Sequence, residues 1–349
     1  MYQGKNIKEQ SKIFVKLLFP VLIYQIISYS SSMIGTFMAG HYSPTDLAGV
    51  SMGVNIWNPV MYTLNSIVLA IVPIVSQLMG KGREQEIPTK VRQFLYIAVF
   101  ISIILIIGLN TLAEPIVNGL GMDENIARVT KKYLFYESIG VLPIFLYVVL
   151  RAFMDSLGLT GLSMIMMVIS VPVNVLLAYG FIFGKLGMPE LGGAGNGMAV
   201  SLTYTVLFFI ALFLTLKHPK INKYKIFEKE GIKFTHWLEI FKLGVPIAIA
   251  TALETVVFST LSLIVSRFDT TIIASHQAAL NFSGFLYSLP VSVANTVTII
   301  VAYHVGAKNY KMARRYTILG VIMGMIFAFL AGMIVWIFDA NIPYLYSKD

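Results

Sequence analysis

Nine apolar stretches, each long enough to cross a lipid bilayer, dominate this sequence of 349 residues. A helix that rises 1.5 Å per residue needs about 20 apolar residues to cross roughly 30 Å of hydrocarbon. The chain is 57% hydrophobic and only 12% charged, which no water-soluble core of this length requires. The sequence therefore predicts an all-α integral membrane protein with about nine transmembrane helices. We place these helices near residues 14–39, 47–79, 93–118, 131–155, 161–184, 194–217, 238–267, 273–305 and 315–338.

The net charge of +9 comes from lysines and arginines that collect in alternate loops. Such alternation marks membrane topology, and by the positive-inside rule it predicts a cytoplasmic N-terminus in a multi-pass protein of the cell membrane. We therefore expect the lipid bilayer, and no nucleic acid, as the partner of these charges. The basic segments are residues 5–16, 81–92, 217–233 and 308–315.

The hydrophobic pattern begins a second time near residue 240. The Lys-Leu-x-x-Pro of residues 16–20 returns at residues 242–246, and the same shift of 226 positions (246 − 20) carries Gly80 onto Gly306. Because six spans separate the copies, both enter the membrane in the same direction, which predicts parallel repeats related by an axis along the bilayer normal.

This repeat predicts the domain organisation. We expect a complete six-helix lobe in residues 1–217, a cytoplasmic linker in residues 218–237 and half of a second lobe, three helices, in residues 238–349. Completing the second copy takes three further helices, so we expect the parent fold to have twelve helices, six in each lobe, and this chain to be truncated at its C-terminus.

Glu254 is the acidic residue that we place deep inside an apolar span, about 15 residues into the seventh helix and close to the membrane midplane. A carboxylate at this depth costs several kcal/mol unless it is protonated, paired or hydrated. We expect a binding site for an ion, a proton or a cationic substrate. The alternative is a structural glutamate that is hydrogen-bonded to a neighbouring helix.

Other polar residues inside the spans allow two interpretations. Asn174 and Asn281 are candidates to line a polar cavity, although amides also join helices in lipid. Arg151 and Asp155 are four residues apart on one helical face, which predicts a salt bridge with a structural or gating role. His276 has no ligand partner four residues away, so we propose no metal site.

The sequence lacks the motifs of common enzymes: it has no P-loop, no zinc-binding H-E-x-x-H and no G-x-S-x-G. We therefore predict that the protein is not an enzyme, has no catalytic residues and needs no cofactor other than a coupling ion. Abundant Phe, Tyr and Met could accept varied hydrophobic cations, although lipid-facing bulk explains most of them.

Several of these motifs together resemble the multidrug and toxic compound extrusion (MATE) family, in particular its NorM-like bacterial branch. The resemblance covers nearly the whole chain. Its glycine-rich loop and its membrane glutamate are the most specific features. The motifs are residues 38–40, 73–80, 151–158, 184–195 and 246–254.

The resemblance implies an antiporter with two six-helix lobes that exports small hydrophobic cationic drugs in exchange for sodium ions or protons, as a monomer when complete. Glu254 matches the family's second-lobe cation-site glutamate, and Asn174 matches a polar residue of the first lobe. Gly35 stands where the family's first-helix aspartate is expected, and Ala178 stands where many relatives have another polar residue.

Two rival functions remain open at the level of sequence. A lipid-linked oligosaccharide flippase has a related architecture, but such proteins usually need basic residues inside the cavity to hold phosphate. An inactive membrane remnant is suggested by Gly35 and by the three expected helices that this sequence lacks.

Overall fold

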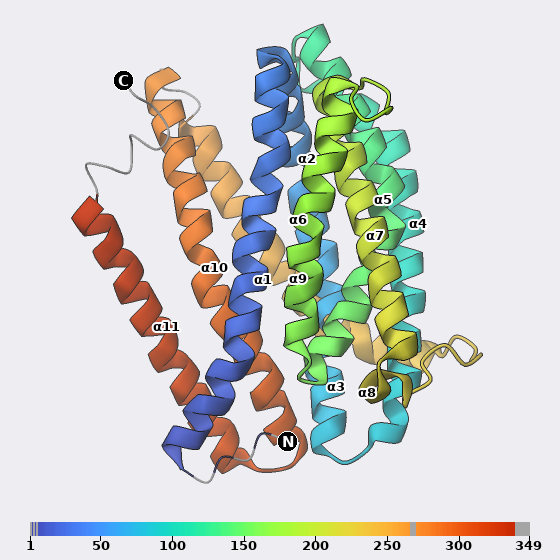
Figure 1. Ribbon diagram of the computed structural model, residues 1–349, viewed down its shortest axis with the longest axis vertical. Coiled ribbons are helices and arrows are strands. Elements are labelled where there is room, and N and C mark those ends of the chain that lie inside the picture. The colour runs from blue at the N-terminus through green and yellow to red at the C-terminus, as the bar shows by residue number, and fades with distance from the viewer. Residues whose placement is uncertain (1, 3, 5, 266–269, 339–349) are drawn as a thin grey trace.

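The computed structural model describes residues 2, 4, 6–265 and 270–338, and these ranges form helices and the loops that join them (Figure 1). Nine helical segments in this part of the chain are long and apolar enough to cross a membrane, which confirms the predicted all-α membrane fold. The longer helices are α1 (Ile7–Tyr42), α2 (Pro44–Leu69), α3 (Ile71–Gly80), α4 (Ile87–Gly119), α5 (Glu124–Ser156), α6 (Thr160–Phe183), α7 (Gly195–Lys217), α9 (Phe234–Val265), α10 (Thr270–Gly306) and α11 (Tyr310–Phe338). The short helices are η1 (Glu84–Glu86), η2 (Gly192–Ala194) and α8 (Pro219–Asn222).

The predicted second span is divided at Ala70 into α2 and α3. Pro73 has no amide hydrogen, so the carbonyl of Leu69 lacks the donor that a continuous helix would supply. The amide of Ala70 instead donates to the carbonyl of Ile67 at 3.3 Å, as in a tighter turn. Beyond this break, α3 packs against α10.

The glycine-rich loop after α6 folds back onto the corner between α1 and α2. The amide of Gly193 donates to Asp46 Oδ1 at 2.7 Å, and the hydroxyl of Tyr42 donates to Glu190 Oε1 at 2.9 Å. A Cβ atom on Gly193 would lie 2.6 Å from the Cβ of Asp46. This loop therefore needs glycine for close packing at the end of the helices.

We call α1–α7 the first lobe and α9–α11 the second lobe. Helix α5 lies at the centre of the first lobe, where it packs against α2, α4 and α7. In the most apolar 18-residue stretch of α5, 67% of the residues are buried, whereas in that of α11 only 6% are buried. Most side chains of α5 therefore pack against protein, and those of α11 are left for the surrounding lipid.

The contacts between the two lobes are reciprocal with respect to the sequence repeat, in which α9 is the counterpart of α1, and α10 is the counterpart of α2 and α3. Helix α1 packs on α10, α2 packs on α9, and α3 crosses α10. The segment Pro44–Gly80 and helix α10, Thr270–Gly306, begin and end at positions that differ by the repeat shift of 226 (306 − 80). The first helix of each copy therefore packs on the second span of the other copy, and α3 packs on its own counterpart, the end of α10.

The linker and the N-terminus lie at the same end of the molecule, at the bottom of Figure 1. The backbone carbonyl of Tyr2 is bound to the second lobe, because it accepts hydrogen bonds from His304 Nε2 on α10 at 3.0 Å and from the hydroxyl of Tyr316 on α11 at 3.2 Å. We call this end the linker end.

The linker is fastened to the start of α4. Arg92 Nε lies 2.9 Å from Glu230 Oε2, and Gln93 Nε2 donates to the carbonyl of Gly231 at 3.0 Å. The buried amine of Lys90 contacts Glu239 at the start of α9. The linker therefore follows the first lobe closely and does not hang free between the lobes.

Candidate transport site

Glu254 lies inside α9 and is paired with a phenol. Its Oε1 accepts a hydrogen bond of 2.7 Å from the hydroxyl of Tyr287 on α10. Both side chains are exposed. In the described part of the chain, no lysine, arginine or histidine forms an ion pair with Glu254. The negative charge of an ionised Glu254 therefore has no protein counter-charge there.

The register of the helices shows which way this pair points. Three residues before Glu254, Thr251 Oγ1 lies 2.9 Å from Ser66 Oγ on α2. Three residues before Tyr287, a Cβ atom on Gly284 would lie 2.5 Å from the hydroxyl oxygen of Tyr29 on α1. Three residues turn a helix by about 300°, so both side chains point within about 60° of the first lobe. The exposed pair lies at the boundary between the lobes.

Arg151 and Asp155 form the predicted ion pair, with Arg151 Nη1 at 2.9 Å from Asp155 Oδ2. Asp155 Oδ1 also accepts a hydrogen bond of 2.6 Å from Ser163 Oγ on α6. The guanidinium carbon of Arg151 lies 4.6 Å from the ring centroid of Tyr24 on α1. The pair thus joins α1, α5 and α6 inside the first lobe, and its gating role stays a prediction.

Asn174 is buried between α6 and α7. Its Nδ2 donates to Thr203 Oγ1 at 3.3 Å, while its Oδ1 has no hydrogen-bond partner. This hydrogen bond joins α6 to α7, so it fits the interpretation in which the amide joins helices rather than lines a cavity. The side chains of Asn281 and His276 lie outside the described residues.

In the structure, the space beside Gly35, where the family's aspartate was expected, is occupied by another residue. A Cβ atom on Gly35 would lie 1.7 Å from Oδ1 of Asn196, which reaches across from the start of α7. The space of a side chain at position 35 is therefore filled by an amide from another helix. Sequence reasoning did not identify Asn196, because this pairing depends on how α1 and α7 pack.

Glu254 is not the only acid deep inside an apolar span, so that expectation was wrong. Glu137 lies near the middle of α5 and is 1% exposed. Its Oε1 accepts a hydrogen bond of 2.8 Å from the hydroxyl of Tyr133, and its Oε2 has no partner. The sequence signal that was missed is Asp123, whose side chain caps the helix at its first turn and places Glu137 more than three turns inside it.

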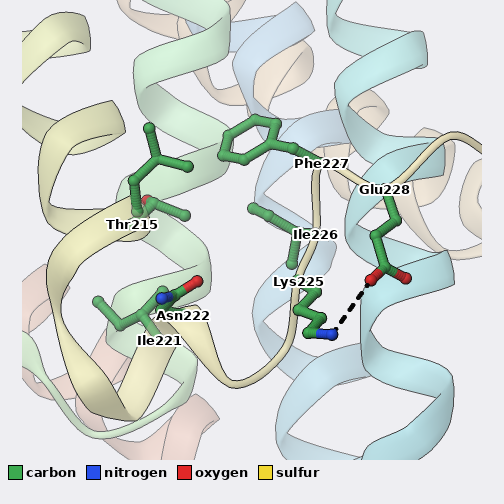
Figure 2. A pocket seen from close by; sticks show the side chains of 8 residues that line it. Thr215, Ile221, Asn222, Lys225, Ile226, Phe227 and Glu228 are labelled. Carbon is green, nitrogen blue, oxygen red and sulfur yellow. Dashed lines mark ion pairs between the residues drawn. The ribbon is translucent and has the colours of Figure 1, made fainter.

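A small pocket lies apart from these residues, at the linker end. It has a volume of about 220 Å³ and is formed by the end of α7, by α8 and by the linker. Figure 2 shows Thr215, Ile221 and Phe227 around it, with Lys225 Nζ 3.6 Å from Glu228 Oε1 at its edge. This pocket is not continuous with any residue that we consider for transport.

Known proteins match this chain over nearly its whole length. The MatE family model matches residues 20–180 and 246–349, on both sides of the linker. A probable multidrug resistance protein NorM of Oceanobacillus iheyensis is 39% identical over 350 residues, which cover 100% of this chain and 78% of that protein. The protein of the same name from Streptococcus pneumoniae strain R6 is 40% identical over 349 residues, 100% of this chain and 77% of that protein.

The fold is also found among solved structures. The structure described as the outward-facing conformation of a multidrug resistance MATE family transporter of the MOP superfamily has a TM-score of 0.84. It is 14% identical, and the match covers 97% of this chain and 74% of that one. The chain thus belongs to the multidrug and toxic compound extrusion family, whose members are multi-span membrane transporters and not enzymes.

Proposed function

We propose that this protein is an antiporter that exports small hydrophobic organic cations in exchange for protons or sodium ions. The observation that carries the proposal is Glu254, a carboxyl group inside a membrane span whose hydrogen-bond donor is a neutral phenol, Tyr287. A carboxylate without a counter-charge is costly in a membrane, so a proton or a cation is needed to neutralise it. A coupling ion and a cationic drug would meet that need alternately.

Such alternation couples the ion gradient to export if the ion binds the two conformations of the transporter with different affinity. The position of Glu254 and Tyr287 beside the lobe boundary supports this role, because relative movement of the lobes changes their surroundings. The similar proteins are named as probable multidrug resistance proteins, which supports drugs as the substrates.

The arrangement of charge favours a cationic substrate over a lipid-linked phosphate. Among the described residues near the lobe boundary, the acid Glu254 is accompanied by hydroxyl groups, while most lysines and arginines lie at the linker end. A flippase for lipid-linked oligosaccharides would need basic side chains in the cavity to hold phosphate. We therefore place the flippase second.

We further propose that the linker and the N-terminus face the cytoplasm of a cell membrane and that the protein works as a monomer. The basic loops support this orientation, because positively charged loops are retained on the cytoplasmic side. The contacts of Tyr2 with His304 and Tyr316 then tie the N-terminus to the second lobe at the cytoplasmic side.

Ethidium efflux from cells that express the protein tests the proposal. We expect Glu254→Gln to abolish efflux, because glutamine fits the same space but cannot release a proton or carry a charge. Glu228→Gln, which removes an exposed acid in the linker, is the matched control and should leave efflux unchanged. Undiminished efflux by Glu254→Gln would reject this role for the carboxyl group.

Two further measurements address the rival functions. Purification of the wild-type chain as a folded, monodisperse species that gives no efflux would favour the inactive remnant. Growth of a flippase-deficient strain rescued by the chain would favour the flippase.

A further inference from the structure

We propose that Glu137 is a second proton-binding residue, located inside the first lobe and loaded independently of Glu254. The role of this proton in transport rests on the proposed ion-coupled function, whereas the binding of the proton itself does not. The proposal starts from the isolation of the carboxyl group: it is 1% exposed, and one of its two oxygen atoms has no hydrogen-bond partner.

Glu137 is held where α5 meets α2 and α7. On the α2 side, Thr130 Oγ1 donates to the carbonyl of Gly49 at 2.9 Å. On the α7 side, Ser201 Oγ donates to the carbonyl of Tyr136 at 2.6 Å, beside a close approach at Gly140. These backbone contacts fix α5 just before and just after Glu137, so its side chain cannot turn out into lipid without separating packed helices.

Among the described residues, the titratable groups near Glu137 are phenols and not cations. Tyr133 on α5 donates to its Oε1, and Tyr204 on α7 lies within electrostatic range of the carboxyl group. Tyr62 on α2 lies within electrostatic range of both phenols. The positive charge of Arg151 is engaged by Asp155, 2.9 Å away. From α4, the packed polar group is the amide of Asn110, which donates to Ser138 Oγ at 3.3 Å and carries no charge.

An ionised carboxylate in this environment would lack the counter-charge that buried charges require. Binding of one proton at Oε2 removes the negative charge and leaves the hydrogen bond from Tyr133 to Oε1 in place. A metal cation fits less well, because hard cations are held by about six oxygen ligands. Among the described side chains, the direct hydrogen-bonded group at this position consists of the Glu137 carboxyl and the Tyr133 phenol, fewer oxygen ligands than such a cation needs.

Two further phenols, Tyr147 and Tyr204, lie on the side of Glu137 toward the linker end. Asp155 lies 18 residues farther along α5, which is five full turns, so both acids lie on the same face of the helix. Between them, the rings of Tyr147 and Tyr204 are 5.8 Å apart. Tyr204 lies within electrostatic range of both Glu137 and Arg151. The hydroxyl of Tyr147 has no hydrogen-bond partner among the described residues, so these phenols place polar groups between the two acids without forming a hydrogen-bonded chain.

Infrared spectroscopy of the purified full chain in lipid tests the binding of the proton directly. A protonated carboxyl group gives a C=O stretching band that shifts in heavy water. We expect this band in the wild type, in Glu254→Gln and in the control Glu114→Gln, which changes an exposed acid paired with Lys131. We expect the part of the band that remains in Glu254→Gln to be lost when Glu137→Gln is added, because a protonated Glu254 contributes a band of its own. Titration from about pH 5 to about pH 9 covers the range in which buried glutamates titrate.

Tyr133→Phe separates proton binding from a merely structural contact. It removes the hydrogen bond to Oε1 and keeps the carboxyl group, so the band should persist at a higher frequency. If Glu137→Gln does not accumulate, Glu137→Asp keeps the acid in a new position, and the band must shift. A spectrum that is the same in the wild type and in every Glu137 variant overturns the proposal.

The two proposals can fail separately. Loss of efflux in Glu254→Gln without any band from Glu137 rejects the second proton site and keeps the antiporter. Undiminished efflux in Glu254→Gln together with a band that depends on Glu137 keeps the proton site and rejects Glu254 as the coupling group. Within the antiporter, Glu137→Gln should flatten the pH dependence of efflux while drug still binds.

Discussion

Gly80 and Gly306 occupy matching positions in the two copies of the repeat, and each packs against the backbone of the other copy. A Cβ atom on Gly80 would lie 1.9 Å from the carbonyl oxygen of Tyr303, and one on Gly306 would lie 2.1 Å from the carbonyl oxygen of Gln77. Gln77 and Tyr303 are themselves matched by the repeat. The crossing of α3 and α10 is therefore nearly symmetric and leaves no room for a side chain.

Gly80→Ala should loosen this crossing. The added methyl group meets a backbone carbonyl that cannot move alone, and overpacking of this kind costs about 1–3 kcal/mol. Because the chain contains no cysteine, spin labels can be placed at Lys81→Cys and Lys311→Cys. We expect a longer distance between the labels in Gly80→Ala. The control is Gly108→Ala, where a Cβ would meet nothing within 4 Å; equal distances in both variants would contradict the prediction.

The buried pair of Arg151 and Asp155 should matter far more to stability than an exposed pair. Replacing Asp155 by Asn leaves a buried guanidinium without its counter-charge, which typically costs about 3–5 kcal/mol. Replacing Glu114, whose exposed carboxylate lies 3.3 Å from Lys131 Nζ, should cost less than about 1 kcal/mol. Thermal unfolding of the purified variants in detergent measures the difference, and similar melting temperatures would show that the buried pair adds little.

Gly35 and Asn196 should behave as a coupled pair. Gly35→Asp places a side chain where Asn196 Oδ1 now lies, 1.7 Å from the new Cβ. We expect a loss of about 1–3 kcal/mol from overpacking. Asn196→Ser makes room, so the double variant should be more stable than Gly35→Asp alone, a departure from additivity that is expected only for residues in contact. Strictly additive melting temperatures in the four-protein cycle would disprove the contact.

We expect the linker to detach from α4 at acidic pH, because protonation of Glu230 weakens its contacts. The hydrogen bond from Lys233, with further help from Thr89 and Arg92, lowers the pKa of the Glu230 carboxyl below its ordinary value of 4.5. Because the folded state lowers this pKa, the carboxylate stabilises the attached linker above about pH 4.5, and the stabilisation is lost as the pH falls through the lower value.

Hydrogen exchange of the linker amides as a function of pH measures this effect. We expect exchange, corrected for its intrinsic pH dependence, to rise below pH 4.5 in the wild type. In Glu230→Gln it should already be raised at neutral pH and should change little on acidification. An identical pH profile in the two proteins would rule out Glu230 as the titrating group.

The number and order of the helices could be predicted from sequence because membrane spans are recorded in local composition. The break at Ala70 was also within reach, since Pro73 removes a donor wherever it occurs in a helix. Ends were less accurate: the fourth span was expected to begin at residue 131, but its helix begins at Glu124. With a helix that begins at residue 131, Glu137 would lie only six residues inside it (137 − 131).

The sites depended on information that lies outside any single span. Glu254 was found because it lies about 15 residues into an apolar span, whereas its hydrogen bond to Tyr287 depends on how α9 meets α10. The filling of the space at Gly35 by Asn196 joins residues 161 positions apart (196 − 35). Neither contact has a local sequence signal, since each arises when separate helices pack.

The attachment of the linker to α4 determines where the molecule can flex. The ion pair of Arg92 with Glu230 and the contact of Lys90 with Glu239 tie the chain to the first lobe until α9 has begun. The next weak point is Pro246, which cannot donate to the carbonyl of Lys242. The pivot for any rocking of one half against the other thus falls within a membrane helix, eight residues before Glu254 (254 − 246), so a swing of the second lobe would turn that acid directly.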